Sequence, residues 1–160
     1  MGNLLGGSRV LAMDYTPSVT VFDTTQISNI TSTAYTAGSP EVGVTFMAPT
    51  TGRVLITTGG GFRNNGSNAD RVFLSPQVFL GTDNTGTEVL HPTAPQYGVS
   101  SGGGYTLDDF QFLSRTTLLD QLTPGSTYYV RTMHCQVNHL ATPAGTVDLV
   151  DRTLVVAPAS

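Results

Sequence analysis

Hydrophobic and polar residues alternate in short segments along most of the chain. In segment 41–47, Val42, Val44 and Phe46 fall on one face, and in segment 53–59 Val54 and Ile56 do the same. A period of two is typical of a β-strand with one buried face. The pattern predicts strands at residues 9–13, 18–22, 27–35, 41–47, 53–59, 71–81, 87–91, 109–118, 126–137 and 148–158. The predicted core includes Val42, Val44, Phe46, Val54, Ile56, Val130 and Leu154.

Turn-forming residues separate these segments. APTTG (48–52) and LTPGS (122–126) place proline before glycine, as tight reversals between strands require. Residues 113–122 could instead form one helical turn, but the Arg-Thr-Thr in this segment favours a strand. Many short strands separated by turns predict an all-β protein, an antiparallel β-sandwich with a jelly-roll-like arrangement.

The first part of the chain is expected to form an extended N-terminal arm. Strand-like residues 9–13 and 18–22 are split by Asp14-Tyr15-Thr16-Pro17, which suits a bend and not a tight hairpin. We therefore assign residues 1–26 to the arm and 27–160 to the sandwich domain. Such an arm can add a strand to the sheet edge of a partner. Its apolar contacts would come from Leu4, Leu5, Val10 and Leu11. The alternative is that residues 9–13 form an ordinary edge strand of the same sandwich.

The chain has few charged residues, and their distribution limits the kinds of molecule that it is expected to bind. Charged residues make up 11% of the 160 residues, against roughly 25% in ordinary soluble domains. The seven positive residues are all arginine, are scattered along the chain, and leave a net charge of −4. No basic stripe is visible, so we expect no nucleic-acid partner.

Other sequence features point away from membranes and export. No apolar run approaches the ~20 residues that span a bilayer, so no membrane partner is expected. The first eight residues lack the pattern of a signal peptide, and we expect synthesis in the host cytoplasm without an export signal. The single cysteine, Cys135, rules out an intramolecular disulfide and is expected to be a small buried strand residue.

Two glycine runs, at 59–61 and 102–104, raise the possibility of a phosphate-binding loop. Such a loop leads from a strand into a helix, but Phe62 is followed by further turn residues, and no lysine is present. We interpret the first run as a strand that leads into a flexible crest. The second run lies in a long loop, residues 92–108.

No set of residues predicts catalysis or metal binding. His134 and His139 are five residues apart, which places them on opposite faces of a continuous strand. Asp148 and Asp151 are likewise expected on opposite faces, and residues 81–88 lack the terminal glutamate of a calcium-binding hand in the required position. We expect a non-enzymatic protein without a metal or cofactor.

Three aromatic residues stand beside glycine-rich loops, outside the strand pattern. Phe62, Tyr97 and Tyr105 could plug an open end of the sandwich, or they could bind a partner or stack on a sugar. Both interpretations stay open at this point.

Four stretches carry a resemblance to a known class of proteins. Residues 31–65, 70–90, 112–131 and 151–160 resemble small virion structural proteins of tailed actinobacterial phages, of the head-decoration or minor tail type. This resemblance implies a structural protein of the virion that decorates and stabilises the capsid, with capsid or tail proteins as partners. The alternative that it implies is a minor tail protein or adhesin that binds host surface carbohydrate through loop aromatics.

A shorter stretch resembles a different group. VTFMAPTTGRVLI (44–56) is similar to the strand–turn–strand of tumour-necrosis-factor-type jelly rolls. That similarity implies a homo-oligomer, with a trimer favoured.

Overall fold

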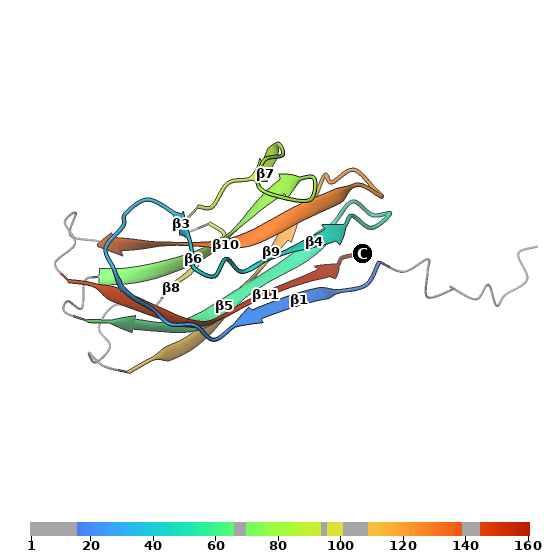
Figure 1. Ribbon diagram of the computed structural model, residues 1–160. Coiled ribbons are helices and arrows are strands. Elements are labelled where there is room, and N and C mark those ends of the chain that lie inside the picture. The colour runs from blue at the N-terminus through green and yellow to red at the C-terminus, as the bar shows by residue number, and fades with distance from the viewer. Residues whose placement is uncertain (1–15, 66–69, 94–95, 101–108, 139–144) are drawn as a thin grey trace, which may run out of the picture.

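The described part of the chain folds into two stacked antiparallel sheets. A computed structural model describes residues 16–65, 70–93, 96–100, 109–138 and 145–160. These residues form eleven strands and no helix. In Figure 1 the sheets lie as two layers, with β1, β11 and β5 in the lower layer and β10 and β6 in the upper layer. The prediction of an all-β sandwich is confirmed.

The first sheet, called sheet A here, has the strand order β1-β11-β5-β9, and β2 also pairs with β11. Its strands are β1 (Val19–Asp23), β2 (Ile27–Ile30), β5 (Val54–Asn64), β9 (Gln111–Leu119) and β11 (Val147–Pro158). The pairing of β11 with β5 is interrupted by a bulge between Val150 and Thr153. This bulge changes which face the following side chains occupy.

The second sheet, called sheet B here, has the order β3-β10-β6-β7, with β4 on β10 and β8 on β6. Its strands are β3 (Thr36–Ala37), β4 (Gly43–Met47), β6 (Asp70–Leu80), β7 (Glu88–Leu90), β8 (Val99–Ser100) and β10 (Thr127–Asn138). Consecutive strands β4, β5 and β6 change sheet at each step. Crossovers of this kind between two packed antiparallel sheets are typical of a jelly roll.

The core fills the space between the sheets. Val42, Phe46, Val54, Ile56, Val130 and Leu154 are all buried, as predicted, whereas Val44 is half-buried and packs against the same cluster. The rings of Phe46 and Tyr128 stack with their centroids 5.7 Å apart. A second cluster, which includes Phe62 and Leu149, fills the other end of the sandwich.

The structure corrects the interpretation of the first glycine run. Gly59, Gly60 and Gly61 lie buried inside β5, and the strand continues to Asn64. All three pair with β9, and Gly59 and Gly61 also pair with β11 on either side of its bulge. The run is therefore strand interior and not a flexible crest. Part of the predicted long loop is also strand, because β8 pairs with β6 through Phe73↔Ser100. The segment 113–122 is strand up to Leu119, as its sequence favoured.

The sandwich begins before residue 27, where the sequence predicted the end of the N-terminal arm. β1 pairs with β11 of the same chain in a continuous register from Val19↔Val156 to Asp23↔Arg152. Residues 19–23 therefore belong to sheet A. The predicted strand at 9–13, together with the arm residues Leu4, Leu5, Val10 and Leu11, lies outside the described residues. The docking of residues 1–15 on a partner stays a prediction.

Candidate interaction surface

The outer face of sheet A carries rows of uncharged side chains. Strand pairing sets outward positions side by side, as in Leu55↔Leu118, Thr57↔Thr116, Gly59↔Ser114 and Gly61↔Phe112. Strands β11 and β1 continue these rows through pairs such as Thr57↔Val155 and Phe22↔Thr153. We call this surface the uncharged face. It consists of Thr20, Phe22, Leu55, Thr57, Gly59, Gly61, Phe112, Ser114, Thr116, Leu118, Thr153, Val155 and Ala157.

Large apolar side chains stand exposed on the uncharged face. Phe112 is 65% exposed and Phe22 is 55% exposed, while Leu55 and Leu118 are exposed beside each other at the opposite end of the face. Hydroxyl groups fill the centre, where Thr57 and Thr116 share a hydrogen bond of 2.8 Å between their Oγ1 atoms. Exposed apolar side chains gathered on one surface mark a place where a partner binds.

A groove runs across this face. It has a volume of about 580 Å³ and lies between Phe22 of β1 and Phe112 of β9. Gly59 and Gly60 form its floor, and Asp151 lies at its side. A methyl group on Gly61 would stand 2.9 Å from the Phe112 ring, so the bare backbone lets that ring lie close to the sheet. The glycine run thus leaves room for the groove, because these residues have no side chains to fill it.

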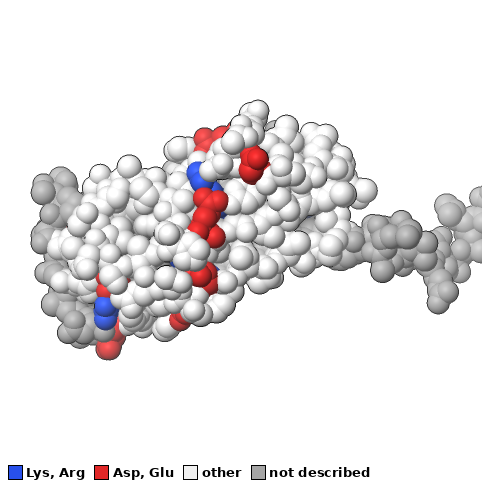
Figure 2. Space-filling view, in the orientation of Figure 1, with Lys and Arg blue, Asp and Glu red and all other residues white. Residues whose placement is uncertain are grey.

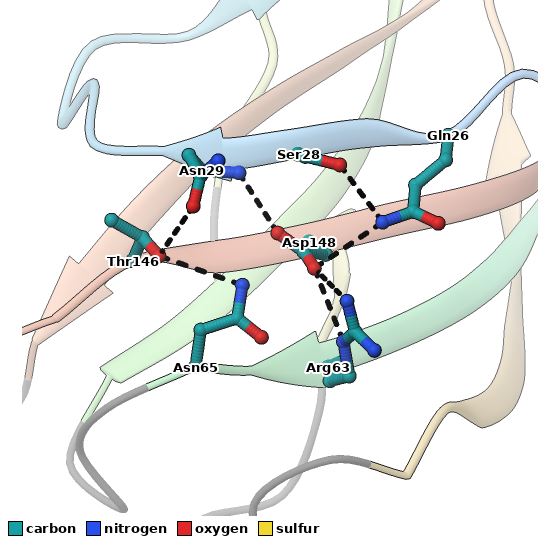
Figure 3. Close-up of polar contacts among 7 residues, drawn as sticks. All are labelled: Gln26, Ser28, Asn29, Arg63, Asn65, Thr146 and Asp148. Carbon is teal, nitrogen blue, oxygen red and sulfur yellow. Dashed lines mark hydrogen bonds and ion pairs between the residues drawn. The ribbon is translucent and has the colours of Figure 1, made fainter.

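A polar cluster closes one end of the uncharged face, where β2, β11 and β5 meet (Figure 3). Asp148 is nearly fully buried, and its carboxylate pairs with the guanidinium of Arg63. The same carboxylate accepts hydrogen bonds from the Asn29 amide at 2.8 Å and the Gln26 side chain at 3.3 Å. Arg63 also lies over the Phe110 ring, 4.6 Å from its centroid. Because these donors converge on Asp148, the cluster ties the three strands together.

The outer face of sheet B differs because charged groups cover it. Arg131 forms an ion pair with Glu41 at 2.7 Å. Its Nε also donates a hydrogen bond to Gln77 Oε1 at 2.9 Å. Gln77 in turn donates to Glu88 at 2.6 Å. Burial, with the hydrogen bond to Glu41, raises the pKa of Tyr129 to about 12. In Figure 2 the charged side chains visible from one side form a band across the middle and a small group at the lower left, and they leave most of the described surface uncharged.

A buried arginine lies between the sheets. Arg152 is fully buried, and its Nη2 donates to Asp23 Oδ1 at 2.7 Å, whereas its Nε and Nη1 have no hydrogen-bond partner. Desolvation raises the pKa of Asp23, but the hydrogen bond and charge of Arg152 and the bonds from Thr25 outweigh it and lower that pKa. Gly38 packs against the guanidinium, since a methyl group there would come within 1.8 Å of Nη1.

His134 and Cys135 are structural residues of β10. Burial, together with the nearby charge of Arg152, lowers the pKa of His134 to about 4, so its imidazole is neutral at pH 7. His134 Nε2 lies 3.3 Å from Thr36 Oγ1. Burial raises the pKa of the Cys135 thiol, which opposes a role as a nucleophile. His139, the second histidine of the candidate metal pair, lies outside the described residues.

The structure places the three predicted loop aromatics differently. Phe62 is fully buried in the core, which agrees with the plugging interpretation and removes it as an exposed contact residue. Tyr97 is half-buried against the core, and Tyr105 lies outside the described residues. The exposed aromatics of the described surface are instead Phe22 and Phe112, which the sequence analysis did not single out. The alternation of Phe112, Ser114, Thr116 and Leu118 in one strand is the signal that could have identified Phe112.

Within the described ranges, no three residues of the types His, Cys, Asp and Glu gather into a metal-binding group. The described part of the chain also contains no helix with the length and apolarity needed to cross a bilayer.

Comparisons with known proteins identify the fold class. No protein-family model and no curated protein matches the sequence. The fold matches chains of infectious bursal disease virus structures at low sequence identity. A chain of the T13 viral particle matches with a TM-score of 0.53 and 15% identity over 89% of this chain and 31% of that chain. The VP2 subviral particle matches with a TM-score of 0.51 and 15% identity over 89% of this chain and 32% of that chain.

A third match, to the Gt strain of the same virus, has a TM-score of 0.51 and 12% identity over 90% of this chain and 32% of that chain. The chain therefore spans about a third of the length of these viral proteins. Together with the strand order, the matches define a jelly-roll β-sandwich of the kind found in these virus particles.

Proposed function

We propose that the chain is a non-enzymatic structural protein of a tailed-phage virion, which decorates and stabilises the capsid surface. The observation that carries this proposal is the fold. The jelly-roll sandwich matches part of a viral particle chain, and the match covers 89% of this chain. The sequence resemblance to phage decoration and minor tail proteins supports the same role and implies capsid proteins as partners.

The polar groups of the described residues support a structural role rather than a catalytic one. Asp148 is held by donors from three directions, and Glu41 is paired with Arg131 and bonded to Tyr129. A carboxylate in such a network is poorly placed to exchange protons with a substrate, because its lone pairs already accept hydrogen bonds. His134 is buried between the sheets, away from any substrate in solvent.

The alternative function is a minor tail protein or adhesin that binds host surface carbohydrate. It relied on loop aromatics, and the burial of Phe62 removes one of them. Tyr97 and Tyr105 alone give this alternative less support than the capsid role has.

Labelling of intact virions tests the proposal. A small peptide tag after the exposed Ser160 would be detected with gold-conjugated antibody on particles of the phage that encodes the chain. We expect gold over the heads, and untagged particles serve as the control. Gold confined to the tails would support the alternative function. Virions that contain none of the chain, as measured by mass spectrometry of purified particles, would contradict both.

A further inference from the structure

We infer that the uncharged face of sheet A is covered in the assembled protein by a second copy of this chain. This inference rests on a surface in the described residues, and it deepens the proposed structural role. It does not depend on whether the protein sits on the capsid or on the tail.

Charge distribution provides the first argument. The thirteen residues of the uncharged face include no charged side chain. The charged residues next to it are Asp151 at the side of the groove, the Arg63–Asp148 ion pair at one end, and Arg53 and Asp120, which flank the strands at the other end. An uncharged centre surrounded by a charged rim is the usual anatomy of a protein–protein interface. The charged chain of Glu41, Arg131 and Glu88 gives the outer face of sheet B no comparable centre.

Shape provides the second argument. Phe112 and Phe22 project from the same face that contains the groove floored by Gly59 and Gly60. An interface between identical copies about a two-fold axis needs protrusion and depression on one surface, because that surface packs against itself. A face with aromatic projections beside a glycine-floored groove meets this requirement.

Size provides the third argument. Each outward position occupies ~4.8 Å between strands and ~6.6 Å along a strand, so the thirteen outward positions give a face of about 400 Å² in projection. Two such faces bury roughly 800 Å² in projection, somewhat below the ~1,000 Å² of accessible surface that a specific interface needs. The exposed phenylalanine and leucine side chains add to that area. A small sugar would leave most of this surface uncovered, and a second copy would cover it.

The experiment measures the mass of the full-length protein in solution by sedimentation velocity over a range of concentrations. We expect wild-type protein to sediment as two chains, because the inferred interface packs the uncharged face of one copy against that of the other. Phe112→Asp, which places a charge at the exposed end of the groove, should shift the protein to the mass of one chain. Ser114→Arg, midway along the edge strand β9 of this face, should do the same.

Met47→Asp is the matched control, because Met47 is 55% exposed but lies on the outer side of β4 in sheet B. It should leave the oligomer intact. Circular dichroism melting checks that each variant is folded, and Ser114→Arg decides the matter if Phe112→Asp fails to fold. A wild-type protein that is monomeric at all concentrations overturns the inference, as does a monomeric protein whose groove binds soluble glycans. Neither result affects the labelling of virions, so failure of this inference and failure of the proposed function are distinguishable.

Discussion

Strand alternation places each side chain either in the core or in solvent, and Phe46 is one of the side chains that it places in the core. Its ring is 5% exposed and stacks on Tyr128, whose hydroxyl accepts a hydrogen bond from the Thr123 amide at 2.9 Å. Phe46 therefore connects the core to the turn that precedes β10.

Removal of this ring should destabilise the protein strongly. We expect Phe46→Ala to lower the free energy of unfolding by about 3–5 kcal/mol, because it removes a buried aromatic ring and leaves a cavity. Reversible urea unfolding measures the change, and Met47→Ala, at the exposed neighbouring position, serves as the control. A loss below about 1 kcal/mol would show that the ring is not packed in the core.

His134 should make stability depend on pH. Its pKa is about 4 in the folded protein and 6.5 when unperturbed, so the unfolded chain binds the proton more readily between these values. Stability is therefore complete above pH 6.5 and falls as the pH is lowered toward 4, by up to about 3 kcal/mol. Urea unfolding at several pH values measures this slope.

The control for the pH experiment is His134→Asn, which should flatten the slope between pH 6.5 and 4. The carboxylate of Asp23 titrates below this range, because its pKa is lowered from 3.8. If the slope is unchanged in His134→Asn, another group is responsible and the assignment to His134 is wrong.

At the scale of secondary-structure elements, the bulge in β11 decides which residues face the core. Regular alternation from Leu149 would put Asp151 inside and Arg152 outside. Asp151 instead has a left-handed backbone (φ 52°) and lines the outer groove, while Arg152 turns inward and is fully buried. Asp148 and Asp151 thus share the outer side of the sheet, which corrects the expectation that they lie on opposite faces.

The bulge leaves Arg152 in a buried ion pair with Asp23, and replacing one or the other residue should change the stability of the protein by different amounts. Asp23→Ala leaves the Arg152 guanidinium buried without its only described partner and should lower the melting temperature clearly. Arg152→Met removes the buried charge and keeps an unbranched apolar chain, so its stability should stay within about 1 kcal/mol of wild type or exceed it. Thermal unfolding of both variants measures the difference. Equal destabilisation by both substitutions would contradict this explanation.

At the scale of the whole molecule, all strands of the described sandwich lie at or after Val19, and β1 stands at the edge of sheet A. We therefore predict that the sandwich folds without the first fifteen residues. We retain the proposal that the preceding segment docks on a partner, through Leu4, Leu5, Val10 and Leu11.

Deletion of residues 1–15 should therefore separate folding from attachment. We expect the truncated protein to keep a cooperative thermal transition close to that of the full chain, and to bind to particles that lack the protein at much lower occupancy. Occupancy is measured by quantitative mass spectrometry of the purified particles, with full-length protein added back as the control. Truncated protein that binds at full occupancy would rule out the arm, and truncated protein that is unfolded would show that this segment belongs to the sandwich.

The sequence by itself determined the fold class and nearly all of the strands. The period of two in segments such as 41–47 and 126–137 depends only on the backbone geometry of a strand, so it can be recognised without knowledge of the neighbours. The same pattern identified Val54, Ile56 and Leu154 as core residues, because one face of each strand must leave water. The pattern could not show that Arg152 points into the core, because a bulge depends on the register between two paired strands.

Only the tertiary structure decided what the glycine run and the aromatic residues do. Glycine fits a turn, a crest or a strand interior equally well in isolation, and pairing with β9 and β11 selected the strand interior. Phe62 became a core residue and Phe112 an exposed one because of the side of sheet A on which each lies. Strand alternation separates the two faces of a strand, but only the packing of sheet B against sheet A determines which face is covered. For that reason, the candidate interface emerged from the structure and not from the sequence.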